Sequence, residues 1–285
     1  MISSASARRT QGGTTLVELL IATALFSVVL LNLAWVTVLV GRMTSEETAS
    51  SVLSATSRNV LDWMRQDSIG STQVLSTLTS GGVTYTSSPA GVVILQMPTV
   101  TYAGNGTVST IYLDDVVYHL AGAKAPYTLN KVIVPQSGSP MLAQADTVIA
   151  QNVQSLAIGF EHHIAWTGNG TSSVFALDVP ANGATATNTT GDVGGTSVLF
   201  GTGVAQASFV AVSSQYPNGA ISFPVVPATG QTVDVLYPVD STQAAGQAGV
   251  SELTFDLTFS APVVVPGVAA TQSLEMVSAA QLRNH

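Results

Sequence analysis

Hydrophobic and polar positions divide this chain into a helical first part and a strand-rich remainder. Leu19 to Val40 is a run of 22 residues without a charged side chain. At about 1.5 Å per residue, a helix of this length extends about 33 Å, enough to cross the hydrocarbon core of a bilayer. Four polar residues interrupt the run: Thr23, Ser27, Asn32 and Thr37. The pattern predicts a long helix, and we expect its first half, residues 14–40, to span a membrane.

Beyond this run the pattern becomes amphipathic. One helical face carries the apolar residues of this part: Leu53, Val60, Leu61 and Met64. No proline occurs before Pro89, so one helix from Thr15 to about Asp67 is allowed. Gly41 is its weakest position, where a kink or local melting is expected, because glycine costs about 1 kcal/mol relative to alanine in a helix. We expect the half over residues 41–67 to pack against its own domain.

After Ile69 the pattern favours strands. Short β-branched runs alternate with turn residues: Val92–Leu95, Thr107–Leu113, Val116–Leu120 and Lys131–Val134. Asn105-Gly106 is typical of a hairpin turn. Asp114-Asp115 is expected to close the next hairpin, since turns use paired aspartates more often than calcium or catalytic sites do. The expected fold class is α+β, with a long N-terminal helix packed on an antiparallel sheet.

Charge and composition narrow the function. Only 8% of residues are charged, and the formal net charge is −8. Beyond Gln66, the chain has twelve acidic residues and only three basic ones: Lys124, Lys131 and Arg283. Nucleic-acid binding depends on basic residues that neutralise phosphates, so direct binding is disfavoured. The chain has no cysteine, which excludes a disulfide framework, a thiolate nucleophile and a Cys-based zinc site.

One carboxylate, Glu18, directly precedes the apolar run. A charge well inside a bilayer costs on the order of 2–3 kcal/mol, and somewhat less near an end. If the chain were cut after Gly13, the new α-amino group of Thr14 on an adjacent copy could approach Glu18. Such a pair at about 4 Å gains about 4 kcal/mol at an effective dielectric constant near 20, before desolvation is subtracted. We expect the pair to fix the axial register between neighbouring helices.

The segment Gly13-Thr14-Thr15-Leu16-Val17-Glu18 resembles the class III signal of type IV pilins and type II secretion pseudopilins. The resemblance implies that residues 1–13 are a prepilin leader and that prepilin peptidase cuts after Gly13. It also implies N-methylation of Thr14 and a role for Glu18 in inserting the subunit into the filament. The family usually has Phe after the glycine, so methylation of Thr14 stays open.

Arg8 and Arg9 precede the apolar run, which favours an N-terminus in the cytoplasm. A secretory signal peptide fits poorly, because its apolar core spans about 7–15 residues and ends in a small-residue cleavage site. A twin-arginine signal matches the flanking residues weakly. The family likeness implies a single-pass protein of the inner (cytoplasmic) membrane, with its C-terminal headgroup outside the cytoplasm. The likeness also implies that the subunit later enters an extracytoplasmic filament.

Further segments are similar to the minor pilins of the J/W type: Leu61–Asp67, Val116–Leu120, Ala150–Phe160 and Leu282–Asn284. This likeness implies a β headgroup over residues 68–166 and 250–285. The Gly/Thr-rich and β-rich stretch 167–249 is then an insertion, expected to make subunit-specific or tip-specific contacts. Strand-like runs occur within it: Ala207–Val212, Ile221–Val226 and Thr232–Leu236.

Other chemistry is sparse. Glu161-His162-His163 suggests a metal site, but alternate residues of a strand face opposite sides, so at most two ligands share a face. We expect an ordinary, partly exposed strand and no catalytic residue, cofactor or metal. The partners implied are other pilins through the N-terminal helix, prepilin peptidase, the inner-membrane assembly platform and the bilayer. Two alternatives remain: a membrane-anchored extracytoplasmic β-rich adhesin or enzyme, and a competence (DNA-uptake) pilin.

Overall fold

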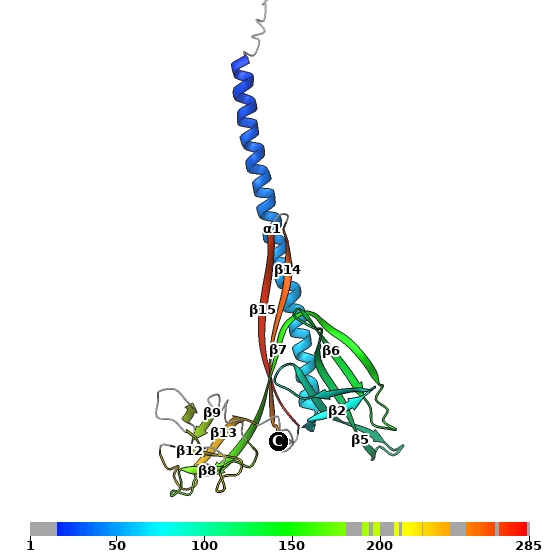
Figure 1. Cartoon of the computed structure of the whole chain (residues 1–285), viewed down its shortest axis with the longest axis vertical. Helices are drawn as coiled ribbons and strands as arrows, with labels where there is room; N and C mark the ends of the chain where they lie inside the picture. The colour runs from blue at the N-terminus through cyan, green and yellow to red at the C-terminus, as the bar shows by residue number, and fades with distance from the viewer. Residues whose placement is uncertain are drawn as a thin grey trace, which may run out of the picture. The chain divides into compact units, whose positions relative to one another are not determined.

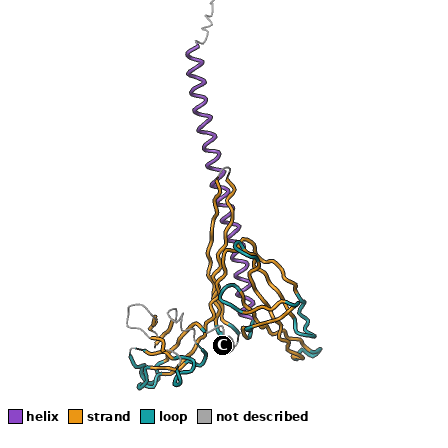
Figure 2. The backbone as a smooth tube through the Cα atoms, in the orientation of Figure 1, coloured by secondary structure: helices purple, strands orange, loops and turns teal. Residues whose placement is uncertain are grey.

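The structure is a computed structural model that describes residues 16–180, 190–193, 196–199, 208–210, 213–223, 225–239, 249–265 and 268–283. Gly13 and Thr14 lie outside these ranges. The chain forms two compact units. One comprises Met1–Ala49 and Pro262–Thr271, and the other comprises Ser50–Ala261 and Gln272–His285. Apart from one helix, the described part consists of strands and loops (Figure 2).

Helix α1 runs without interruption from Leu16 to Gly70 over 55 residues (Figure 1). The single long helix predicted from Thr15 to about Asp67 is therefore confirmed, and it continues three residues further. Gly41 lies inside the helix, and the local melting expected there is not observed. Because the chain lacks proline in this part, every backbone N–H group remains available as a helical donor.

Antiparallel strands form the rest of the fold. The main sheet has ten described strands, with the order β1-β4-β5-β6-β7-β13-β9-β10; off this path, β14 pairs with β7, and β15 pairs with β14. Their bounds are Gln73–Val74 (β1), Val92–Tyr102 (β4), Val108–Ala121 (β5), Tyr127–Val134 (β6), Gln144–Thr167 (β7), Thr232–Pro238 (β13), Thr190–Val193 (β9), Thr196–Leu199 (β10), Glu252–Val265 (β14) and Val268–Gln281 (β15). Two small sheets accompany it: β2 (Thr77–Ser80) with β3 (Val83–Thr86), and β11 (Ser208–Val210), β12 (Ala220–Ser222) and β8 (Val174–Ala176).

Strand β7 is the longest of the described strands and has partners on both edges. Val153 pairs with Tyr127 of β6 and also with Phe259 of β14. Glu161 pairs with Pro238 of β13 and also with Glu252 of β14. Because a residue has only one neighbour on each edge, β6 and β13 follow one another along one edge, and β14 occupies the other. The strand thus connects the sheet before residue 167 with strand β13, which comes from the stretch 167–249.

The core lies between the second half of α1 and one face of the sheet. The predicted apolar face of the helix is buried, with at most 5% of each residue exposed: Leu53, Val60, Leu61 and Met64. Alternate residues of β14 meet the same core and are fully buried: Leu253, Phe255, Leu257 and Phe259. A smaller cluster of Ile94, Val117 and Val132 lies on the opposite face, where Leu78 and Tyr85 of the β2–β3 hairpin pack on it. The sheet is therefore covered on both faces at β4 and β5.

The two predicted turns have different outcomes. The Asn105-Gly106 turn is confirmed: it joins β4 and β5, and Gly106 has a φ of +81° that suits glycine. The hairpin predicted at Asp114-Asp115 is wrong, because both residues lie inside β5. Asp114 is fully buried, and it accepts hydrogen bonds of 2.7 Å from the Gln136 backbone N–H and from the Ser139 hydroxyl group. A buried aspartate is stable within this strand because both donors satisfy its carboxylate. These donors lie more than twenty residues away, so no local sequence pattern reveals them.

Candidate functional site

The first half of α1 presents an apolar surface. Its large apolar side chains are exposed from Leu16 to Val40, with between 40% and 76% of each accessible. This helix is long and apolar enough to cross a membrane, and the described residues contain one such helix. Among the residues that the structure describes, this single N-terminal apolar helix is compatible with single-pass membrane anchoring.

The polar residues of this half are satisfied within the helix itself. The four side chains that interrupt the apolar run each donate to a backbone carbonyl group one turn earlier, at 2.8–3.0 Å: Thr23, Ser27, Asn32 and Thr37. An unpaired hydroxyl or amide group in hydrocarbon costs several kcal/mol, so such bonds suit a helix in lipid. Arg42 and Glu46 form a 2.7 Å ion pair one turn apart, just beyond the run. The charges begin where the apolar surface ends.

Glu18 lies in the first turn of α1 and is exposed. A carboxylate there interacts favourably with the positive end of the helix dipole, by about 0.3–1 kcal/mol. Sequence reasoning did not use this contribution, although an acid just inside a helix start is a recognisable pattern. Of the three predicted site residues, only Glu18 is described, so the structure leaves the predicted relation of Gly13, Thr14 and Glu18 untested.

A partly buried ionic cluster joins the other end of α1 to the sheet. Asp67 Oδ2 accepts hydrogen bonds of 2.6 Å from the Tyr118 hydroxyl group on β5 and from Lys131 Nζ on β6. Lys131 Nζ also lies 5.4 Å from the centre of the Tyr118 ring. Burial first, and then the neighbouring Asp67 carboxylate, raise the pKa of Tyr118, which therefore stays protonated as a donor. Sequence reasoning missed this cluster because its members are 51 and 64 residues apart.

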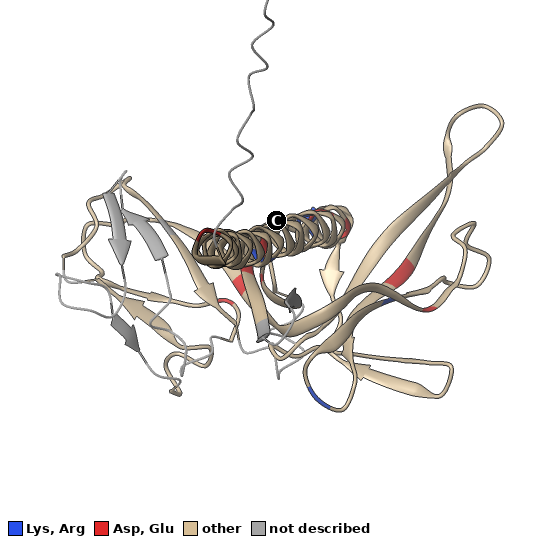
Figure 3. Cartoon of the chain, turned by 90° about the horizontal axis from the view of Figure 1, so that it is seen from above, with Lys and Arg blue, Asp and Glu red and all other residues tan. Residues whose placement is uncertain are grey.

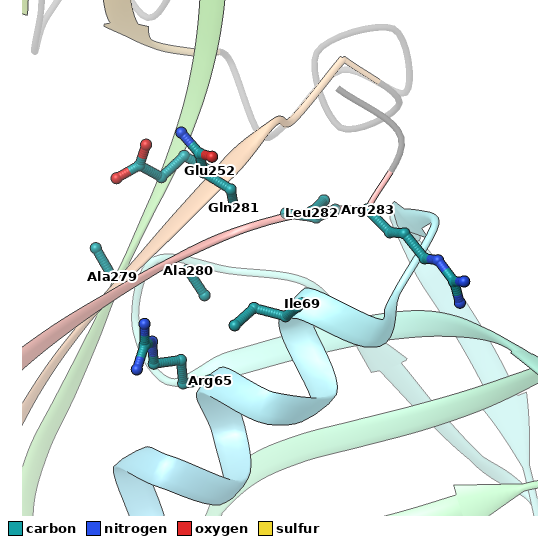
Figure 4. A pocket seen from close by; sticks show the side chains of 8 residues that line it. All are labelled: Arg65, Ile69, Glu252, Ala279, Ala280, Gln281, Leu282 and Arg283. Carbon is teal, nitrogen blue, oxygen red and sulfur yellow. The ribbon is translucent and has the colours of Figure 1, made fainter.

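The C-terminal residues meet the same end of the helix. The Arg283 backbone N–H donates to the Ser71 carbonyl group at 3.1 Å, and the Leu282 N–H donates to the Ser251 carbonyl group at 2.8 Å. A groove of about 530 Å³ lies beside them (Figure 4), lined by Arg65, Ile69, Glu252, Ala279, Ala280, Gln281, Leu282 and Arg283. In this view Arg283 points away from the other lining side chains. The groove combines small apolar residues with a few charges and presents no hydroxyl or imidazole group that suits nucleophilic catalysis.

The Glu161-His162-His163 segment lies in β7, as expected, but His162 is buried. Its Nδ1 atom contacts the Gly249 carbonyl oxygen, and its Nε2 atom lies 3.3 Å from Asp178 Oδ2. Glu161 faces Glu252, and burial first and then this carboxylate raise the pKa of Glu161. In the part of the chain that the structure describes, no three His, Cys, Asp or Glu side chains are arranged to hold a metal ion. Through its two contacts, His162 joins β7 to Gly249 and Asp178.

No family model, curated protein or solved structure matches this chain. Function is therefore inferred from its own residues and geometry.

Proposed function

We propose that this chain is a minor pilin or pseudopilin, a structural subunit of a type IV pilus or type II secretion filament. The observation that carries the proposal is the division of the continuous helix α1 into two surfaces. Its first half exposes apolar side chains, whereas its second half buries one apolar face against an antiparallel sheet. A subunit that is stored in a membrane and then packed by its helix into a filament needs both surfaces on one helix.

In this proposal the chain is held in the inner membrane by residues 14–40, with its C-terminal part outside the cytoplasm. Prepilin peptidase removes residues 1–13 and methylates the new N-terminus at Thr14. The hydrogen bonds that Thr23 and Asn32 donate inside the helix keep the span acceptable to lipid. The same apolar surface later packs against the helices of other subunits, which replace the lipid.

Glu18 sets the axial register in this proposal. Apolar helices slide past one another easily, because their contacts change little with axial offset. A carboxylate at one position, neutralised by the Thr14 amino group of a neighbouring subunit, penalises every other offset. The pair therefore contributes more to specificity than to affinity.

The similarity to J/W-type minor pilins gains support from one direct contact and one indirect connection between the segments that carry it. Asp67, at the end of the first segment, accepts the hydrogen bond from Tyr118 in the second. The Leu282 N–H group, in the last segment, donates to the carbonyl group of Ser251, which directly precedes β14, and β14 pairs with the third segment on β7. Residues 68–166 and 250–285 are then the headgroup, and 167–249 is an insertion for subunit-specific or tip-specific contacts. Within that stretch, β13 pairs with β7 and so is bound to the headgroup sheet.

N-terminal sequencing and intact mass measurement of the protein from native membranes test the processing step. We expect the chain to begin at Thr14 and to carry one added methyl group there. Assembled filaments that contain chains still beginning at Met1 would contradict the proposal.

A Glu18→Ala substitution tests the register. We expect membrane insertion and leader removal to continue, while incorporation into filaments is lost. Glu46→Ala is the matched control, since Glu46 is an exposed acid on the same helix with an internal partner, Arg42. A membrane-anchored adhesin would instead keep its function in the Glu18→Ala protein.

Measuring the affinity for DNA across a salt series distinguishes a competence (DNA-uptake) pilin that binds DNA directly from a pilin that does not. Charged residues are sparse along the described strands (Figure 3), and those beyond Gln66 are mostly acidic. We expect weak binding by the full chain in detergent. Tight binding with a steep dependence on salt would favour a DNA-binding pilin.

A further inference from the structure

Strands β4 and β5 extend beyond their other partners as a two-stranded arm. Strand β1 pairs with β4 only at Leu95 and Gln96, and β6 pairs with β5 only from Asp115 onward. Beyond these partners, residues 98–113 pair with one another and with no other described strand. An isolated two-stranded hairpin is marginally stable in water, whereas packing of one face against a partner stabilises it.

The two sides of this arm differ in polarity. Alternate residues of a strand face opposite sides, and directly paired residues share a side. One side carries mainly threonine: Thr99, Thr101, Thr110 and Tyr112. The other side, the arm face, carries Pro98, Val100, Tyr102, Val108, Ile111 and Leu113. Four residues of the arm face are exposed, with between 42% and 66% of each accessible: Tyr102, Val108, Ile111 and Leu113.

A polar pair separates the arm face from the covered part of the same sheet face. Gln96 Nε2 lies 3.4 Å from Asp115 Oδ1, between the arm and the apolar cluster on which the β2–β3 hairpin packs. That cluster is buried, whereas the arm face keeps its large side chains exposed. Exposed apolar patches with a polar rim mark interaction sites. The arm face is therefore a candidate contact surface.

The distribution of charge indicates which partner fits the arm face. The chain has a formal net charge of −8, but residues 98–113 contain no Asp, Glu, Lys or Arg. Two copies of an acidic chain repel one another, and this repulsion is smallest where both surfaces lack charge. Association with an anionic bilayer depends on Lys and Arg, which the arm lacks. An uncharged apolar face is also complementary to itself, as a twofold contact requires.

We propose that the arm face packs on the arm face of a second copy of this chain, with the two hairpins antiparallel. Ile111, at the middle of the arm, then meets its own counterpart near a twofold axis. Tyr102, at the tip of one arm, covers Pro98 at the base of the other. Asp115 lies two residues beyond Leu113, so antiparallel packing holds the two Asp115 carboxylates at opposite ends of the contact. Parallel packing would bring these carboxylates together.

The size of the arm face sets the strength of this contact. Five residue pairs at about 3.4 Å per residue give a face about 17 Å long, and its two strands lie about 4.8 Å apart. Such a face buries on the order of a few hundred Å² per copy, less than the roughly 800 Å² per partner of a standard interface. The contact is therefore weak in dilute solution and forms between copies that share one membrane, where their effective concentration is high. It depends only on membrane anchoring, and not on the proposed filament function.

Site-directed cross-linking tests the contact. The chain has no cysteine, so a single introduced cysteine is its only thiol group. The full chain carrying Ile111→Cys, in vesicles of phosphatidylcholine, is treated with a short bismaleimide. Thr110→Cys is the matched control, because Thr110 is the adjacent exposed residue and lies on the other side of the arm. We expect at least about tenfold more cross-linked dimer from the Ile111→Cys protein than from the Thr110→Cys protein.

A charge on the arm face tests whether apolar packing holds the two copies together. Tyr102→Asp in the Ile111→Cys protein places two carboxylates in the contact, so we expect cross-linking to fall to the level of the Thr110→Cys protein. Thr110→Asp in the Ile111→Cys protein adds the same charge on the other side and should leave cross-linking unchanged. Equal cross-linking of the Ile111→Cys and Thr110→Cys proteins would overturn the proposal. Quenching by brominated lipid of a fluorophore attached to the Ile111→Cys protein would show that the bilayer covers the arm face, and would also overturn it.

Discussion

The Tyr118 hydroxyl group donates a 2.6 Å hydrogen bond to Asp67 Oδ2, joining β5 to the last turns of α1. Only 17% of the Asp67 side chain is exposed, so its charge depends on protein partners. Lys131 provides the opposite charge at 2.6 Å, and Tyr118 provides an oriented donor. The contact fixes where the helix ends on the sheet, and apolar packing alone would not specify that position.

Replacing Tyr118 by Phe removes this donor and keeps the ring. We expect the free energy of unfolding to fall by about 1.5–3 kcal/mol, the range for hydrogen bonds to charged groups. Denaturant titration of the full chain in detergent measures the loss. Tyr102→Phe is the control, because Tyr102 is 66% exposed, and it should change the free energy little. Equal stability of the Tyr118→Phe protein and the wild type would show that Lys131 alone satisfies Asp67.

Met64 connects the helix to the core of the sheet and is fully buried. Met64→Ala leaves a cavity, so we expect the free energy of unfolding to fall by about 2–5 kcal/mol. Met43→Ala makes the same change on the same helix at a residue that is 61% exposed. The Met43→Ala protein should keep the stability of the wild type in detergent. Similar losses in both proteins would contradict the division of α1 into two surfaces.

The helix and its buried face were predictable because both depend on local information. The absence of proline and the spacing of Leu53, Val60 and Met64 determine them within a few turns. Strand positions such as Val92–Leu95 were also predictable, although Asp114 was read as a turn. Its donors, Gln136 and Ser139, come from a distant loop, so no local pattern could indicate a buried aspartate.

The candidate site residues also include some that the sequence predicts and some that it does not. The motif from Gly13 to Glu18 is contiguous, so the sequence alone suggests it. The Asp67–Tyr118–Lys131 cluster depends on the pairing of β5 with β6, which places Tyr118 opposite Lys131. Pairing of this kind links residues that are far apart in the chain, and periodicity does not specify it.

Asp114 offers a test of the corrected strand. Asp114→Ala leaves the Gln136 N–H group and the Ser139 hydroxyl group without their acceptor inside the protein. We expect the free energy of unfolding to fall by about 2–3 kcal/mol, because each buried donor left unpaired costs about 1–3 kcal/mol and Ser139 can reorient. Asp62→Ala, at an exposed position of α1, should change it by no more than about 0.5 kcal/mol. A stable Asp114→Ala protein would indicate that both donors reach water.

The pair of carboxylates at Glu161 and Glu252 predicts a dependence of stability on pH. Burial first and then Glu252 raise the pKa of Glu161, so the folded state favours its neutral form. Above the ordinary glutamate pKa of about 4.3 the folded chain binds more protons at Glu161 than the unfolded chain does. The stability of the folded chain therefore falls as the pH rises through the raised pKa.

Glu161→Gln removes the ionisation, so this protein should be more stable than the wild type at pH 7, with a difference that shrinks toward pH 4. Denaturant titrations between pH 4 and 7 measure it, with Glu275→Gln, at an exposed position of β15, as the control. A gain that is the same at every pH would mean that packing, and not the charge of Glu161, is responsible.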